Sequence, residues 1–161
     1  MSKIEPCLWF DNQAEAAAKF YVETFRACGQ PASLGTISRY GKDMPLPEGT
    51  VLTASFSLAG QDFLALNGGP VYSFSPAISL MVSCADQAEL DAFWDRLSSD
   101  GGKPVQCGWL TDKFGLSWQV VPAVLSQLMK PDQPERAARV MQAIMQMVKL
   151  DIATLQKAYD G

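Results

Sequence analysis

The chain has 161 residues, a length that suits one domain or two small halves packed together. Apolar residues make up 48% of it, which is enough to bury a sizeable core. The formal net charge is −4 and the Lys and Arg residues are scattered, which argues against a nucleic-acid surface or an anionic-membrane surface, because both need clustered cations.

The sequence contains no histidine, which removes the usual general base near neutral pH and the commonest transition-metal ligand. Ser-His and Cys-His nucleophile pairs are therefore excluded. The four cysteines are far apart and form no CxxC pair, so free thiols are expected. Because neither a signal peptide nor an apolar run of transmembrane length is visible, we expect a cytoplasmic protein that does not enter a membrane.

The first half of the chain predicts a strand, a helix and three further strands. The helix begins after Asp11 or Asn12, with Glu15 placed as in a capping box, and it ends near Cys28-Gly29. Alternating or β-branched runs bounded by turn residues predict the strands. Their expected ranges are 4–10, 33–40, 50–58 and 63–67.

The second half repeats this order. A strand over 76–84 leads to a helix that starts at Asp86-Gln-Ala-Glu, much as Asn12-Gln-Ala-Glu starts the first helix 74 residues earlier. The same offset places Phe20 on Trp94. Strands are expected over 105–110 and 116–121. The pattern indicates a β-α-β-β-β unit present twice, with chance similarity of two helix caps as the alternative.

The stretch 107–122 carries the clearest strand pattern. A turn at 112–115 needs positive φ at Gly115. In the following run, Leu116, Trp118 and Val120 fall on one face and are expected in the core. The other face carries Ser117, Gln119 and Val121, which we expect to form the wall of a cleft.

The tail beyond Pro122 predicts helices over 123–129 and 135–149, followed by a last helix that Asp151 caps. An apolar stripe with several methionines runs along the second of these helices. We expect the tail to cover the second half or to bridge to a partner subunit. The stripe comprises Ala137, Met141, Ile144, Met145 and Val148.

These elements together resemble the vicinal oxygen chelate superfamily of glyoxalase and bleomycin-resistance proteins, and within it the PhnB-like, 3-demethylubiquinone-9 3-methyltransferase-like group. The resemblance implies an α+β fold of two βαβββ modules, 1–70 and 76–122, that form a curved mixed sheet with a cleft in a domain over 1–122. A C-terminal helical extension over 123–161 would pack on this domain or on a dimer partner. The modules would pair within the chain or swap between subunits. The strings that carry the resemblance are Leu8-Trp-Phe-Asp-Asn12 with Phe20-Tyr21, Leu66-Asn-Gly-Gly-Pro70, Ala77-Ile-Ser-Leu80, and Cys107-Gly-Trp-Leu-Thr-Asp-Lys-Phe-Gly-Leu-Ser-Trp-Gln119.

Metal-dependent members of the superfamily bind one divalent ion through the first and last strands of each half. Carried over by position, these ligands fall on Glu5 or Pro6, on Ala77 and on Gln119. The fourth strand of the first half offers Leu64 or Leu66 on one parity and Ala65 or Asn67 on the other. A catalytic divalent site wants about three good N, O or S ligands. We therefore predict that no metal and no other cofactor is bound.

The resemblance places a cleft whose walls carry mostly apolar side chains and a few polar groups, as small-molecule sites do. Glu5 is the candidate catalytic residue, a general base if an apolar cleft raises its pKa, and a solvated carboxylate otherwise. Trp9 and Trp109 either stack on a flat ligand or fill the fold. Cys7 is expected to be inert, because no histidine activates it. The full set of predicted cleft residues is Cys7, Trp9, Asn67, Ser79, Met81, Trp109, Ser117 and Gln119, with Glu5.

From these residues we predict a homodimeric, metal-free protein that binds a small, partly aromatic ligand. The alternatives are an enzyme of the same superfamily, with metal-assisted lyase, isomerase or dioxygenase-type chemistry or with Glu5 as the base, and a scaffold whose cleft is filled by its own side chains. The methyltransferase name of the group lacks support. No glycine-rich strand–helix turn that could hold S-adenosylmethionine is visible.

Overall fold

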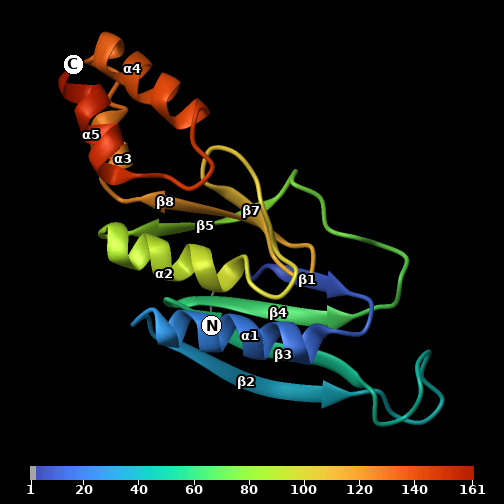
Figure 1. Cartoon of the computed structure of the whole chain (residues 1–161). Helices are drawn as coiled ribbons and strands as arrows, with labels where there is room; N and C mark the ends of the chain where they lie inside the picture. The colour runs from blue at the N-terminus through green and yellow to red at the C-terminus, as the bar shows by residue number, and fades with distance from the viewer. Residues whose placement is uncertain (1–2) are drawn as a thin grey trace. The chain divides into compact units, whose positions relative to one another are not determined.

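The computed structural model describes residues 3–161 and divides the chain into two compact units, the first ending at Phe74 and the second beginning at Ser75. Each unit contains one βαβββ module (Figure 1). The repeat predicted from the two helix starts is therefore confirmed. Within the described residues, none of the helices has both the length and the apolar character needed to cross a membrane.

The first module forms a four-stranded sheet in the order β1-β4-β3-β2. Strand β1 runs parallel to β4, and the other two pairings are antiparallel. Helix α1 connects β1 to β2 and packs mainly on β3. The elements are β1 (Cys7–Phe10), α1 (Ala14–Ala27), β2 (Ala32–Arg39), β3 (Val51–Leu58) and β4 (Gln61–Asn67).

The second module repeats this topology, with strand order β5-β8-β7-β6 and β5 parallel to β8. Three helices follow it. The elements are β5 (Ser79–Cys84), α2 (Gln87–Leu97), β6 (Lys103–Pro104), β7 (Trp109–Thr111), β8 (Ser117–Pro122), α3 (Leu125–Leu128), α4 (Pro134–Met145) and α5 (Ile152–Asp160).

One face of each sheet lies under its helix, and strand alternation decides which side chains occupy that face. In the first module, Leu8 and Phe10 of β1 are buried, as their parity predicts, and Tyr21 of α1 packs against Phe56 of β3. In the second, Trp118 and the other members of its predicted core face are almost fully buried. These members are Leu116 and Val120, and they share the core with Leu90, Phe93 and Leu97 of α2.

Helix α1 begins at Ala14, later than the predicted cap at Asp11 or Asn12, and Gln13 at the cap position makes no side-chain cap bond. The Ala14 N–H donates instead to Oδ1 of Asn67, 53 residues away, at 2.8 Å. Glu15 forms no capping box and pairs with Lys19 at 2.6 Å. The prediction failed because a tertiary partner caps this helix, whereas Asp86 caps α2 locally by accepting from the Glu89 N–H.

The strand predicted over 105–110 is interrupted. Cys107 and Gly108 have φ of +63° and +81°, which belong to a turn. Their N–H groups donate to the carbonyls of Met147 and Val148, each at 2.8 Å, so the tail determines this conformation. The turn at Gly115, with φ of +89°, is as predicted.

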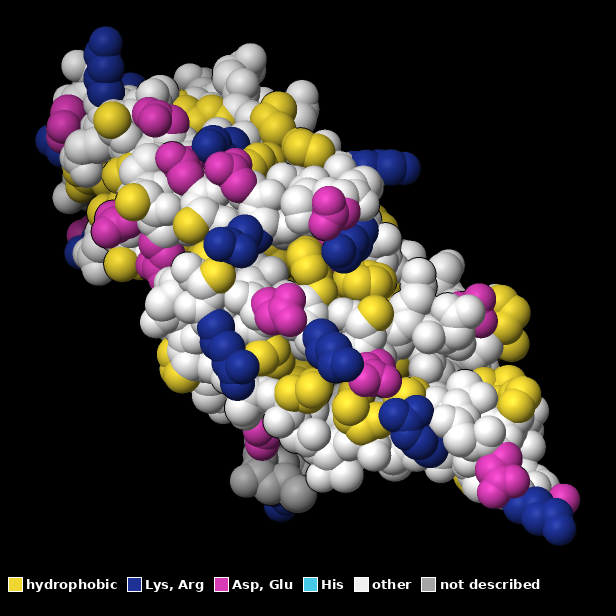
Figure 2. All heavy atoms as spheres, turned by 60° about the horizontal axis from the view of Figure 1, so that its bottom comes forward, with side chains coloured by type: hydrophobic (Ala, Val, Ile, Leu, Met, Phe, Trp, Pro, Cys, Tyr) yellow, Lys and Arg dark blue, Asp and Glu magenta, His cyan; other side chains and the backbone are white. Residues whose placement is uncertain are grey.

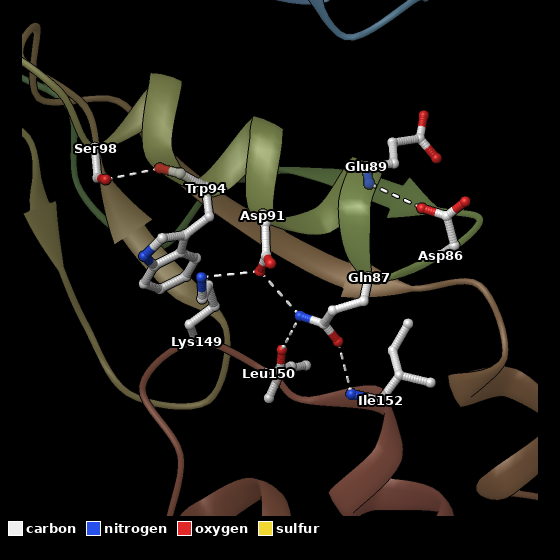
Figure 3. A network of polar contacts seen from close by, with 9 residues as sticks. All are labelled: Asp86, Gln87, Glu89, Asp91, Trp94, Ser98, Lys149, Leu150 and Ile152. Carbon is white, nitrogen blue, oxygen red and sulfur yellow. Dashed lines mark hydrogen bonds and ion pairs between the residues drawn. The ribbon is translucent and has the colours of Figure 1, made fainter.

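The tail packs on the second module through the segment that follows α4. The helix ends at Met145, shorter than predicted, and Val140 and Ile144 are its buried residues. Of the predicted stripe, Ile144 is buried, whereas Met141 and Met145 are 44% and 58% exposed, so the contact of the stripe with a partner subunit stays a prediction. Beyond α4, Lys149 pairs with Asp91 at 2.8 Å (Figure 3).

Gln87 at the start of α2 holds the same segment through both ends of its side-chain amide. Its Nε2 donates to the Leu150 carbonyl at 3.2 Å, and its Oε1 accepts from the Ile152 N–H at 2.9 Å (Figure 3). Asp151 caps α5 as predicted, accepting from the Thr154 N–H at 2.7 Å. The tail is thus fastened to α2 and to the loop that precedes β7.

Candidate functional site

The face of the first sheet opposite α1 carries a hollow of about 430 Å³. Side chains of this face alternate along β3 and β4 with the buried ones, so the helix-covered core and the hollow belong to the two sides of the same strands. The hollow lies within the first unit. Its lining residues are Glu5, Ser33, Gly35, Ser55, Phe56, Ser57, Asp62 and Leu64.

Serine hydroxyls cover the part of this face formed by β2 and β3. The Oγ atoms of Ser33 and Ser57 lie 3.0 Å apart on paired positions of the two strands. Ser55 donates its hydroxyl to the Thr36 carbonyl at 3.2 Å. This cross-strand bonding fixes the hydroxyls in place, so the hollow has an ordered polar wall.

Gly35 lies opposite Ser55, where the pairing of β2 with β3 shifts its register between Leu34 and Ile37. A Cβ at Gly35 would come within 2.5 Å of Ser55 Oγ. A side chain at this position would force the Ser55 hydroxyl to move, and its absence leaves space in the hollow.

Two carboxylates complete the lining. Glu5 precedes β1 and is exposed, and Asp62 stands on β4 opposite Ser57 of β3. Desolvation raises the pKa of the nearby Cys7 thiol, and the negative charge of Glu5 raises it further. The raised pKa disfavours the nucleophilic thiolate form of Cys7, whose side chain is exposed.

Trp9 was predicted to stack on a ligand or to fill the fold, and its surroundings favour the second role. Its Nε1 donates to the Gly69 carbonyl at 2.9 Å, and its ring meets Tyr72 edge-on at 5.0 Å. A Cβ at Gly68 would clash with the ring at 2.2 Å. Trp9 thus anchors the segment that follows β4.

Asn67, predicted to face the cleft, lies on the helix-covered side of β4 and is 2% exposed. Its Oδ1 caps α1 at Ala14, and its Nδ2 donates to the Val51 carbonyl at 3.1 Å. The Asn67 carbonyl also accepts from the Tyr40 hydroxyl at 2.7 Å. These bonds give Asn67 a structural role, and it contributes nothing to the open face.

The predicted residues of the second module gather on the open face of the second sheet. Strand pairing places Met81 beside Gln119, and Gln119 beside Trp109. Gln119 Nε2 donates to Ser79 Oγ at 2.9 Å. Met81 is 63% exposed and Ser117 is buried. The structure therefore brings Ser79, Met81, Trp109, Ser117 and Gln119 together within their own unit.

The donor set does not fit a catalytic divalent cation. The positions carried over from metal-dependent superfamily members offer one carboxylate, Glu5, and one amide, Gln119, which is bonded to Ser79. Leu64 lies on the open face and Ala77 is an exposed residue before β5. Across residues 3–161, no three His, Cys, Asp or Glu side chains gather to form a metal-binding group.

Most residues that line the hollow are not among those predicted from the sequence, namely Ser33, Gly35, Ser55, Ser57 and Asp62. One signal was present. Thr53, Ser55 and Ser57 alternate with Ala54, Phe56 and Leu58, which indicates a strand with one hydroxyl-bearing face.

The surface shows charges of both signs interspersed with apolar side chains on the face drawn in Figure 2. No broad basic patch is visible on that face among the described residues. On that face this distribution agrees with the scattered Lys and Arg residues of the sequence.

Comparison with known proteins gives a family and a fold. The sequence model of the family described as 3-demethylubiquinone-9 3-methyltransferase matches residues 2–121. A PhnB protein from Bacillus cereus, named as a candidate 3-demethylubiquinone-9 3-methyltransferase, is 34% identical, with 76% of this chain and 100% of that chain covered and a TM-score of 0.67. Protein PA1353 from Pseudomonas aeruginosa is 20% identical, with 76% and 98% covered and a TM-score of 0.60. A search of curated proteins found no significant match.

Proposed function

The chain belongs to the 3-demethylubiquinone-9 3-methyltransferase family, which is PhnB-like and has the glyoxalase/bleomycin-resistance fold, and we propose that it binds a small organic molecule in the hollow of its first module without a metal ion. The observation that carries this proposal is the hollow itself. Polar groups held in fixed positions converge there, on the face of the sheet that the helix leaves open.

The size and composition of the hollow support this proposal. Small-molecule sites are concavities of roughly 300–1,000 Å³ with a few well-placed polar groups, and the hollow, at about 430 Å³, falls in this range. The bond from Ser55 to Thr36 orders the wall before any ligand arrives, which lowers the entropic cost of binding.

The methyl transfer in the family's name is not part of the proposal. A Rossmann-type site for S-adenosylmethionine places a glycine-rich turn between a strand and the start of a helix. Here Gly68-Gly69-Pro70 follows β4 and leads into the non-helical stretch before β5, and Gly101-Gly102 follows α2. Neither pair of glycines begins a helix.

Aromatic stacking on Trp9 is also left out, because the ring is already engaged with Gly69 and Tyr72 of its own chain. The absence of a bound metal remains part of the proposal and rests on the poor donor set described above. Element analysis of untagged protein purified without chelator is expected to find less than stoichiometric zinc, nickel, iron or manganese. The homodimer and the cytoplasmic location expected from the sequence remain predictions, and sedimentation analysis tests the first.

A methyl group placed in the hollow tests where the ligand binds. We expect Gly35→Ala to weaken binding of any ligand found by a fragment screen about tenfold or more, because the new Cβ occupies space in the hollow and comes within 2.5 Å of Ser55 Oγ, so that this hydroxyl must move. Gly41→Ala is the matched control, since its Cβ would meet only Met44 Sδ at 3.5 Å and it lies outside the hollow.

Amide shifts of ¹⁵N-labelled protein report both the affinity and the location. The proposal expects shifts at residues 55, 57 and 64 that Gly35→Ala suppresses and Gly41→Ala preserves. A ligand that binds equally well to both variants, or that shifts only residues beyond 75, would overturn it. Native mass spectrometry of freshly purified protein adds the identity of any retained molecule.

A further inference from the structure

The tail carries an exposed apolar seam along α4, and we propose that two copies of this chain pair through it, with their α4 helices antiparallel. The inference goes beyond the proposed ligand site, because it names a surface for the expected homodimer in a part of the chain that does not touch the hollow. The seam comprises Ala138, Met141, Met145 and Val148, all of which are exposed.

Only one face of α4 is used within its own unit. The helix packs mainly on α5, and its buried residues are Val140 and Ile144 (Figure 1). The seam lies on the neighbouring face, where Met141 is 44%, Met145 58% and Val148 47% exposed. Large apolar side chains that lie exposed in a row indicate a surface that a partner covers.

The spacing of the seam indicates that this partner is a helix. Its successive members are three, four and three residues apart, which is the spacing of the a and d positions of a heptad. The Met147 N–H donates to the Ile144 carbonyl at 3.0 Å, so the helical turn continues past the end of α4, and Val148 follows directly. Methionine side chains adapt their shape to the residues that they face.

A second copy of the seam fits it in the antiparallel orientation. In an antiparallel helix pair, each a position of one helix faces a d position of the other. A two-fold axis beside Gln142 makes Met141 face Met145 of the partner subunit. The same axis makes Ala138 face Val148 of the partner subunit, so a small side chain meets a larger one in each outer layer. The surface is therefore complementary to itself, as a two-fold interface requires.

The polar residues beside the seam favour the same arrangement. Glu135, Gln142 and Lys149 recur every seven residues along one side of it. Antiparallel pairing brings Glu135 close to Lys149 of the partner subunit, whereas parallel pairing would set each charge beside its own copy, which is repulsive. Lys149 already binds Asp91, and its ammonium has three donors, so it can bind a second carboxylate as well.

Sedimentation equilibrium of the full chain from about 5 µM to about 500 µM tests the pairing. A seam of about three helical turns buries less than the roughly 1,200 Å² of a stable complex, so we expect a dissociation constant of about 10–100 µM. Met145→Glu should raise it about tenfold or more, because a carboxylate enters the apolar seam twice in each dimer. Met81→Glu is the matched control, since Met81 is a methionine of the same unit that is 63% exposed on the open face of the second sheet.

Cysteine cross-linking tests the antiparallel orientation. Gln142→Cys lies next to the two-fold axis and should form a disulfide with its own copy on mild oxidation with copper phenanthroline. Glu135→Cys should not, because antiparallel pairing separates the two copies of this position by roughly 20 Å along the helix axis. Both changes are made in a Cys7→Ser chain, because Cys7 is exposed. Equal cross-linking at both positions would overturn the antiparallel pairing.

The remaining outcomes also decide the inference. A parent chain that stays monomeric at about 500 µM overturns it, and so does a dimer that Met145→Glu leaves intact. If Met81→Glu separates the subunits and Met145→Glu does not, the chains pair through the open face of the second sheet instead. Far-UV circular dichroism should show the parent fold in both variants, since both methionines are exposed. Ligand-induced shifts at residues 55, 57 and 64 should be the same in Met145→Glu, so the seam and the hollow are judged separately.

Discussion

The two modules share one topology and differ in what their open faces do. The first has two strands of eight residues, β2 and β3, whose serine-bearing face forms the hollow. At the corresponding positions the second has β6 and β7, with two and three residues. On the open face of the second module, Gln119 donates a hydrogen bond to Ser79, and the C-terminal helices follow this module in the chain.

This difference shows how a duplicated unit can divide its tasks. Long hairpin strands provide area for a wall of hydroxyls, which the short β6–β7 pairing lacks. In the loop before β7, the N–H groups of Cys107 and Gly108 instead donate hydrogen bonds to carbonyls of the tail. In the proposed function the first module binds a ligand on its open face, whereas the second module binds the C-terminal segment of its own chain.

The largest stability effect that separates the modules is expected at Asp112. Its buried carboxylate shapes the β7–β8 turn by accepting from the N–H groups of Phe114 and Leu116 and from Trp118 Nε1 at 2.8 Å. The corresponding β3–β4 turn needs no such group, because Ala59 and Gly60 alone adopt positive φ. Asp112→Ala should lower the free energy of unfolding in urea by about 3 kcal/mol or more, since buried donors lose their partner.

Asp132→Ala, in an exposed turn before α4, is the control for this change and should stay within about 0.5 kcal/mol of the parent protein. A loss below 1 kcal/mol for Asp112→Ala would mean that the turn forms without the buried carboxylate.

A middle-sized effect distinguishes the two helix caps. Asn67→Ala removes the long-range cap of α1 and the bond to the Val51 carbonyl, so we expect a loss of about 2–3 kcal/mol in urea unfolding. Asp86→Ala removes the local, exposed cap of α2 and should cost about 1 kcal/mol. Asn12 is the cap position expected from sequence alone. If Asn12→Ala lowered the free energy of unfolding as much as Asn67→Ala does, the assignment of the α1 cap to Asn67 would be contradicted.

The smallest effect concerns the ion pair that fastens the tail to α2. The hydrogen bond from Lys149, and then that from Gln87, lower the pKa of Asp91, and the bond to Asp91 raises the pKa of Lys149. The stability due to Asp91 is thus present above its ordinary pKa of 3.8 and is lost as the pH falls through the lowered value. That due to Lys149 is present below 10.5 and is lost as the pH rises through the raised value.

Both side chains of this pair are partly exposed, at 43% for Asp91 and 38% for Lys149, so solvent screening limits its contribution to about 0.5 kcal/mol. Thermal melts of the parent protein and of Lys149→Met should differ slightly near pH 7 and converge below about pH 3. A difference that persists unchanged at low pH would assign the effect to the packing of the lysine stem.

Local chemistry set much of the fold, and sequence was enough to predict it. The two βαβββ units, the core parity of Leu8 and Trp118, the positive φ at Gly115 and the caps at Asp86 and Asp151 all rest on periodicity or on neighbours within a few residues. The predicted grouping of Ser79, Met81 and Gln119 on one face follows from strand alternation in the same way.

The tertiary structure alone decided the features that depend on distant partners. Asn67 caps α1 at Ala14, 53 residues earlier in the chain, and therefore does not face the predicted cleft. At Cys107, where a strand was expected, the chain forms a turn whose N–H groups bond to carbonyls of the tail. The hollow is lined at Gly35, beside a register shift in the pairing of β2 with β3 that the sequence pattern does not indicate. Periodicity fixes which way a side chain faces, whereas contacts between residues far apart in the chain decide what it meets there.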